Sequence, residues 1–204
     1  MTNSLKLLAV VSALAVGSAA VAQQTPAAQQ PASNSAGLLG QRYASASFAY
    51  FDTNNLSIDA FGTGVGVNLP VRSNLDVGFG YARSWIESFS EANVDSIGAN
   101  ATFIYTGDNF KTFSSVSLGY DWGIFDEEAT TWGASAGAEF AFGSATALTV
   151  SASYDDNFKD GDNGVWSGTA AVNRWLSNRV GVVGAVSLIE GGNIGYSAGV
   201  AFRF

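Results

Sequence analysis

The chain of 204 residues has neither cysteine nor histidine, and only 13% of its residues are charged. Without cysteine it has no disulfide, no thiolate nucleophile and no acylation site for a lipid anchor. Without histidine it lacks the commonest general base of enzymes. The adjacent acids Asp155–Asp156 and Glu127–Glu128 lie in predicted exposed hairpins, where carboxylates are ordinarily solvated. We therefore expect no enzymatic activity and no cofactor.

Long apolar runs are missing as well. Beyond residue 22 no run of about 18 apolar residues exists, so no segment there predicts a membrane-spanning helix. Yet 47% of the residues are hydrophobic and 24 are glycine, which is too apolar for an ordinary exported soluble domain. A chain that places its backbone in lipid without helices must close a β-barrel, because only closure pairs every backbone group. The composition therefore favours an all-β, transmembrane, antiparallel up-and-down barrel.

The first 39 residues predict two regions that precede the barrel. Residues 1–22 carry Lys6, an apolar run from Leu7 to Val16 and the small residues 20–22, which is the pattern of a secretory signal peptide cleaved near Ala22. An uncleaved anchor is the weaker alternative, since the run is short. Residues 23–39 are mostly Gln, Ala, Pro, Ser, Thr and Asn, so we interpret them as a disordered periplasmic lead-in. Residues 40–204 form the barrel domain.

Ten segments of the barrel domain alternate between apolar and polar or small residues, which is typical of strands with two different faces. They cover 41–52, 57–68, 75–82, 97–105, 115–122, 132–142, 148–154, 165–174, 179–189 and 193–204. The eighth offers few apolar side chains to lipid, and the ninth is apolar on both faces, so its register is poorly determined. If both are misjudged, the alternative is an eight-stranded barrel.

A soluble antiparallel sandwich would alternate too, but two features favour lipid. The polar faces consist mostly of Gly, Ser, Thr and Asn, which suits a narrow lumen. Aromatic residues gather at both predicted interfaces, as amphipathic rings do in membrane barrels. One end has Trp85, Trp122, Trp132 and Trp166, and the other has Phe103, Tyr105, Phe140, Phe142 and Phe204.

Charge sorts between the two ends of the predicted barrel. An even number of strands brings both termini to one end, and the basic residues at that end are Arg42, Arg72, Lys111, Arg174, Arg179 and Arg203. All but Asp76, Asp108 and Glu139 of the 17 acidic residues fall on the opposite half. Turns are predicted there near 52–56, 86–94, 123–131, 155–164 and 190–193.

The last strand carries the pattern Ser197-x-Gly199-x-x-Phe202-x-Phe204. It resembles the C-terminal assembly signal of bacterial outer-membrane β-barrels. Together with the turn at 68–71 before the strand at 74–78, it makes residues 40–204 similar to the opacity-like surface barrels. The resemblance implies an outer-membrane location with both termini in the periplasm. Its implied partners are the barrel-assembly machinery, periplasmic chaperones, outer-membrane lipid and lipopolysaccharide, with no nucleic acid and no indicated oligomeric state.

Glu139 is the acid that the alternation places inside the lumen. A carboxylate there needs water or a partner, because an isolated buried charge is costly. We expect Lys111, Arg179 and Arg203 to point inward near the same end and pair with it. Two interpretations follow, a salt-bridged plug of the lumen or a selectivity group in a narrow water-filled pore.

The loop 155–164 is a candidate for calcium, since Asp156, Asp160 and Asp162 could supply hard oxygen ligands. It lacks the spacing and closing Glu of a helix–loop–helix calcium site, and Lys159 lies within it. A turn rich in Gly, Asn and Asp is the favoured interpretation, so we predict no metal site.

These observations predict an envelope barrel that is either structural or a narrow, cation-preferring conduit for ions or small solutes. The alternative is a surface-recognition or adhesin barrel that binds lipopolysaccharide or host ligands through its short acidic outer loops.

Changing Phe204 to Ser should impair insertion into the outer membrane and leave protease-sensitive protein in the periplasm, because the terminal aromatic belongs to the assembly pattern. Fractionation and protease treatment measure this. Phe103→Ser, which removes an aromatic of the same end outside the pattern, is the control. Outer-membrane yields of the Phe204 variant equal to the parent's would contradict the assembly role.

Overall fold

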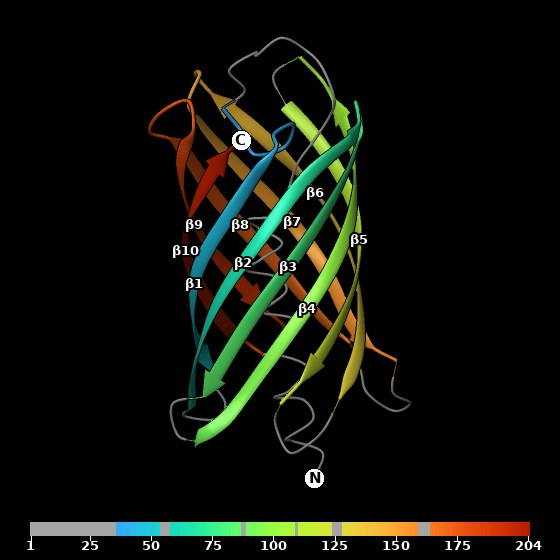
Figure 1. Ribbon diagram of the computed structural model, residues 1–204, viewed down its shortest axis with the longest axis vertical. Coiled ribbons are helices and arrows are strands. Elements are labelled where there is room, and N and C mark those ends of the chain that lie inside the picture. The colour runs from blue at the N-terminus through green and yellow to red at the C-terminus, as the bar shows by residue number, and fades with distance from the viewer. Residues whose placement is uncertain (1–35, 54–57, 87–88, 109, 124–127, 159–163) are drawn as a thin grey trace.

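The computed structural model describes residues 36–53, 58–86, 89–108, 110–123, 128–158 and 164–204. Ten antiparallel strands pair with their neighbours in sequence, and β1 pairs with β10 to close the barrel (Figure 1). The strands are β1 (Tyr43–Thr53), β2 (Ile58–Arg72), β3 (Leu75–Ile86), β4 (Phe89–Thr106), β5 (Phe110–Trp122), β6 (Ala129–Phe142), β7 (Thr146–Asn157), β8 (Val165–Trp175), β9 (Val180–Ile189) and β10 (Asn193–Arg203). Within the described ranges no helix is long and apolar enough to cross a membrane.

The prediction of ten strands is confirmed, and the eight-stranded alternative is wrong. β8 turns Trp166 and Val172 outward. For β9, cross-strand pairing decides the register that the sequence left open. Ser187 pairs with Thr169, and their hydroxyl oxygens lie 2.8 Å apart inside the barrel. The alternate residues of β9 therefore face outward.

Several strands are longer than the sequence predicted. β4 has 18 residues, and the β3–β4 pairing continues to Ile86 and Phe89. The predicted turn at 86–94 was therefore wrong in extent, and the predicted turn at 123–131 ends earlier because β6 starts at Ala129. Hydrophobic alternation shows only the part of a strand that faces lipid, whereas backbone pairing continues wherever two chains run side by side.

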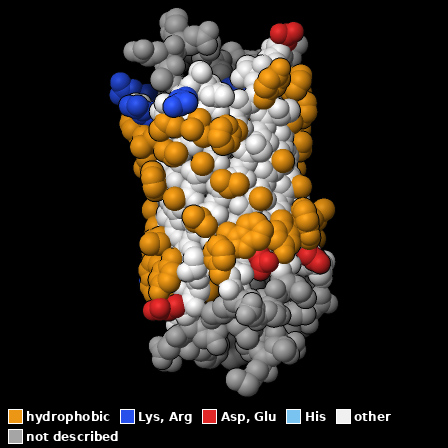
Figure 2. Space-filling model, turned by 90° about the vertical axis from the view of Figure 1, so that its right-hand side faces the viewer, with side chains coloured by type: hydrophobic (Ala, Val, Ile, Leu, Met, Phe, Trp, Pro, Cys, Tyr) orange, Lys and Arg blue, Asp and Glu red, His pale blue; other side chains and the backbone are white. Residues whose placement is uncertain are grey.

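The outer surface of the barrel wall has the distribution of hydrophobic side chains that is expected of a surface in contact with lipid. We call the end at which Tyr43 and Arg203 lie the terminal end, and the opposite end the distal end. Figure 2 shows large hydrophobic side chains gathered near both ends of the wall, with smaller ones between. Phe103, Tyr105, Phe140, Phe142 and Phe204 are exposed at the terminal end. Trp85, Trp122, Trp132 and Trp166 lie near the distal ends of their strands, as predicted.

Charge also separates along the barrel axis. In Figure 2 the basic side chains gather at the terminal end, and the acidic ones lie toward the distal end except for one at the terminal end. Arg83 is a basic residue of the distal half, and its Nε lies 3.9 Å from the Asp95 carboxylate. The same carboxylate accepts a hydrogen bond of 2.5 Å from the Tyr81 hydroxyl. Arg83 is thus compensated on the outer surface.

Changing Val116 to Arg should destabilise the folded barrel by about 2–4 kcal/mol, because the substitution places a charge near the middle of the apolar wall. Val116 lies at the centre of β5 and is 59% exposed. Tyr105→Arg is the matched control. The Tyr105 side chain is 74% exposed among the aromatic residues of the terminal end, where the same charge should cost about 0–1 kcal/mol. Unfolding by urea in lipid bilayers measures both, and equal costs would contradict a lipid-facing wall.

Candidate functional site

The terminal end of the lumen is filled by the chain itself. Residues 36–39, which we name the plug segment, lie inside the barrel, and Ala36, Leu38 and Leu39 are buried. The sequence had placed them at the end of the disordered lead-in, whereas they lie inside the barrel and are in contact with its wall. The earlier residues of that lead-in lie outside the described ranges.

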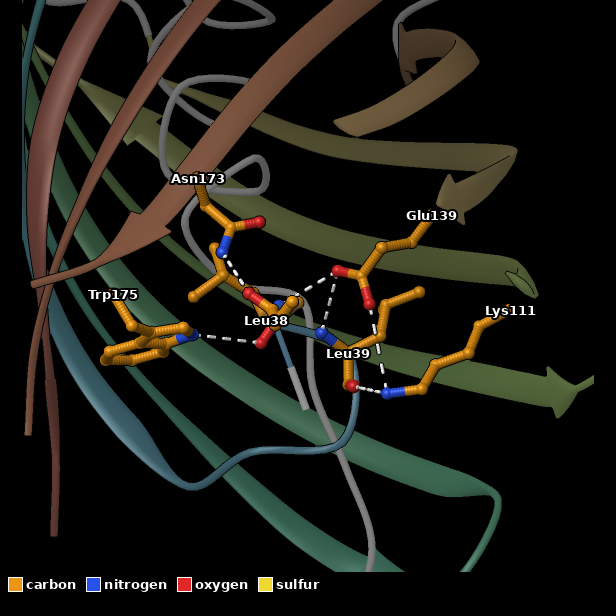
Figure 3. Close-up of polar contacts among 8 residues, drawn as sticks. Leu38, Leu39, Lys111, Glu139, Asn173 and Trp175 are labelled. Carbon is orange, nitrogen blue, oxygen red and sulfur yellow. Dashed lines mark hydrogen bonds and ion pairs between the residues drawn. The ribbon is translucent and has the colours of Figure 1, made fainter. Parts of the chain in front are cut away.

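Glu139 and Lys111 hold the plug segment from one side (Figure 3). The Glu139 carboxylate accepts hydrogen bonds from the backbone N–H of Leu38 at 2.9 Å and of Leu39 at 3.1 Å. The Lys111 ammonium donates to the Leu39 carbonyl and lies 3.8 Å from the other Glu139 oxygen. Since these two residues are cross-strand partners on β5 and β6, the buried carboxylate has both an opposite charge and two donors.

Asn173 and Trp175 of β8 hold the segment from the other side (Figure 3). The Asn173 amide donates to the Ala36 carbonyl at 2.7 Å, and the Trp175 indole donates to the Gly37 carbonyl at 3.3 Å. The Arg203 guanidinium lies 3.6 Å from the centroid of the Trp175 ring, an arrangement that favours the cation and restricts the indole.

Two apolar clusters receive the leucine side chains. Leu38 packs with Tyr43, Trp175 and Ala201, which come from β1, β8 and β10. Leu39 packs with Ile104 and Phe113, which come from β4 and β5. Burying a leucine side chain contributes about 1.5–3 kcal/mol, so apolar burial adds to the polar contacts at both positions.

At Gly37 the plug segment lies close to the Glu139 side chain. A Cβ at this position would overlap the Glu139 carboxylate. Gly40 has a φ of 103°, a left-handed conformation that glycine adopts readily, and it turns the chain from the plug segment toward β1. Sequence reasoning placed Glu139 in the lumen with Lys111 as a partner, which the structure shows, but it missed the plug segment that these residues hold. The available signal was a Leu-Leu pair between two glycines at the end of a polar tract.

The other predicted lumen bases do not join Glu139. Arg203 points inward but lies over Trp175. Arg179 is exposed in the β8–β9 turn, so the expectation that it points into the lumen is corrected. A turn residue follows the local backbone path and not the strand alternation from which that expectation was drawn.

Three further acids on the lumen side were not singled out from the sequence. They are Asp76, Asp121 and Asp155. Asp76 is fully buried and lies close to the Asn68 side chain. Asp155 had been assigned to an outer loop, but it belongs to β7, pairs with Gly133 and Val165, and accepts a 3.2 Å hydrogen bond from Ser153. Each alternates with an outward-facing neighbour, which was the signal available.

The calcium candidate gains no support from the part that can be described. Asp156 accepts hydrogen bonds from the Tyr154 hydroxyl at 3.0 Å and the Asn157 N–H at 2.8 Å. Asp160 and Asp162 lie outside the described residues. Among the residues that the structure does describe, no group of three or more possible metal ligands occurs.

The residues of the C-terminal pattern divide between the two faces of β10. Ser197 and Gly199 face the lumen, whereas Phe202 and Phe204 are exposed outside. Gly199 pairs with Ser47 of β1 at the seam that closes the barrel. A Cβ at Gly199 would come within 2.7 Å of the Ala46 carbonyl oxygen, so this position favours glycine for a packing reason.

Comparison with known proteins identifies the fold alone. No protein-family model and no curated sequence matches the chain. An outer-membrane channel from Pseudomonas putida F1 is similar in structure, with a TM-score of 0.51 and 8% identity over 87% of this chain and 100% of that chain. NanC porin gives a TM-score of 0.48 with 8% identity, over 79% of this chain and 100% of that chain. The β-domain of the Bordetella autotransporter BrkA gives 0.48 with 11% identity, over 80% and 99%.

Changing Gly37 to Ala should release the plug segment, because the added methyl group overlaps the Glu139 carboxylate. Hydrogen exchange of the Leu38 and Leu39 amides should then accelerate by at least about tenfold. Gly168→Ala is the control, since a Cβ there meets nothing nearer than a carbonyl oxygen at 4.0 Å. Unchanged exchange in the Gly37 variant would show that the segment does not depend on this contact.

Proposed function

We propose that this protein is an outer-membrane barrel that forms a narrow, cation-preferring conduit for ions or small solutes. The hydroxyl-lined lumen beyond the plug segment carries the proposal. Inward-facing Ser and Thr side chains of β5 to β10 retain accessible surface, in contrast to the buried residues around the plug. They are Ser115, Ser117, Thr131, Ser135, Thr149, Ser151, Ser153, Ser167, Thr169, Ser187 and Ser197.

Hydrogen bonding organises this lining. Ser153 and Ser167 hydroxyl oxygens lie 2.8 Å apart, as do those of Thr169 and Ser187. Small hydroxyl side chains fixed in this way leave space along the wall and offer polar groups to water. A purely structural barrel would be stabilised better by a lumen filled with large apolar side chains.

Lumen charge supports the preference for cations. In the described ranges four acids face inward, Asp76, Asp121, Glu139 and Asp155, against two bases, Lys111 and Arg203. A confined path of one predominant sign raises the local concentration of the opposite ion. Lys111 offsets Glu139 directly, so Asp121 and Asp155, nearer the distal end, supply the excess.

The proposed orientation places the terminal end in the periplasm. The C-terminal pattern supports this orientation, because its resemblance to the assembly signal implies that both termini lie in the periplasm. The acidic distal rim would then face the cell exterior. In this orientation β10 would present its aromatic side chains to the barrel-assembly machinery, and lipopolysaccharide would surround the distal half.

Changing Asp155 to Asn should reduce the preference for cations at low salt, because it removes a lumen charge while keeping the size of the side chain. The reversal potential across a planar bilayer in a KCl gradient measures the preference. The difference should disappear near 1 M salt, where the Debye length is about 3 Å. Asp108→Asn, at an exposed turn residue of the terminal end, is the control. Anion preference in the parent would contradict the proposal.

A further inference from the structure

The plug segment is bound in the manner of a peptide ligand. Side chains of β5, β6 and β8 satisfy five of its backbone groups: the carbonyls of Ala36, Gly37 and Leu39 and the N–H groups of Leu38 and Leu39. The wall also provides an apolar cluster for each of the two leucine side chains. Backbone contacts of this kind give affinity, and side-chain clusters give specificity. The wall thus recognises the order small, glycine, leucine, leucine.

The segment reaches across the lumen. Its contacts come from β1, β4, β5, β6, β8 and β10, which are distributed around the whole barrel. The close-up shows the Glu139–Lys111 pair and the Asn173–Trp175 pair on opposite sides of the segment (Figure 3). A chain held from both sides at this level obstructs the path along the barrel axis.

The barrel wall does not depend on the segment. The closed β-ladder runs from β1 to β10, and residues 36–39 contribute no strand pairing. If the plug segment left the lumen, its contacts with wall side chains would break, but no hydrogen bond between strands would be lost. This separates the stability of the wall from the occupancy of its terminal mouth.

The charges at the mouth remain compensated without the segment. Glu139 and Lys111 approach each other directly at 3.8 Å, and Arg203 lies over the Trp175 ring. Release would therefore not leave an isolated charge in the lumen, which is the largest penalty that such a site could carry. The freed Asn173 and Glu139 groups would be available to water or to another peptide.

We propose that the terminal mouth is a peptide-binding site whose resident ligand is the plug segment, a tethered and removable stopper that closes the conduit. The closing role rests on the proposed conduit function, whereas the binding role does not. The ligand class is an extended peptide with two adjacent leucines preceded by glycine and a small residue.

Planar-bilayer recordings of the full chain after signal-peptide removal test the closing role. The double variant Leu38→Ser/Leu39→Ser should raise the open fraction by at least about tenfold, because both buried leucines are lost. Leu176→Ser/Leu188→Ser is the matched control, since each of these leucines is 63% exposed. It should behave like the parent.

A synthetic peptide of residues 34–41 should restore closure when it is added to the terminal side of the double variant. The same peptide with Gly37→Ala should not, because its methyl group meets Glu139. An unchanged open fraction in a double variant whose residue 38 and 39 amides exchange freely would overturn the closing role. Equal blocking by both peptides would overturn the recognition.

Calorimetric titration of the same peptides into the double variant in detergent micelles separates the two proposals. If neither parent nor variant conducts, the proposed conduit function is wrong. The titration then tests the peptide-binding site by itself. Binding of the parent peptide but not of the Gly37→Ala peptide would support the peptide-binding site. Absence of binding of the parent peptide would overturn the peptide-binding site.

Discussion

Backbone hydrogen bonding in lipid is the constraint on which this structure depends. Each unpaired backbone group in a bilayer costs several kcal/mol, so the sheet must close on itself. It does so where β1 meets β10, with Gly199 opposite Ser47 and Phe202 opposite Ala44. Once the ladder is closed, every second residue of each strand faces the lumen. The position of each wall charge, inside or outside, follows from that alternation.

Closure has a consequence for polar groups that point inward. Glu139 is buried at the terminal end, where a carboxylate needs an opposite charge and hydrogen-bond donors. Lys111 supplies the charge, and the Leu38 and Leu39 amides supply the donors. Under the proposed release of the plug segment, the two earlier interpretations of Glu139, a salt-bridged plug and a group lining a pore, describe one site in two states of occupancy.

In β9 the sequence pattern predicted a strand but did not determine which of its faces points inward. Valine occupies both of its faces, so hydrophobic alternation did not show which face points into the lumen. The Thr169–Ser187 hydroxyl contact shows which face turns inward, and that contact depends on the pairing with β8. Strand ends were misplaced for a related reason. The pairing of Trp85 with Asn93 continues the β3–β4 ladder past the apolar zone, where side-chain chemistry no longer alternates.

The sequence by itself determined the barrel class, the two aromatic girdles and the inward direction of Glu139, and it favoured ten strands over eight. Each of these follows from residue chemistry repeated at period two, a local property that a single chain displays. Only the tertiary structure decided that residues 36–39 occupy the lumen. The contact between Leu38 and Glu139 joins residues 101 positions apart. No local pattern encodes it, because the recognising side chains are brought together by six different strands only after the barrel has closed.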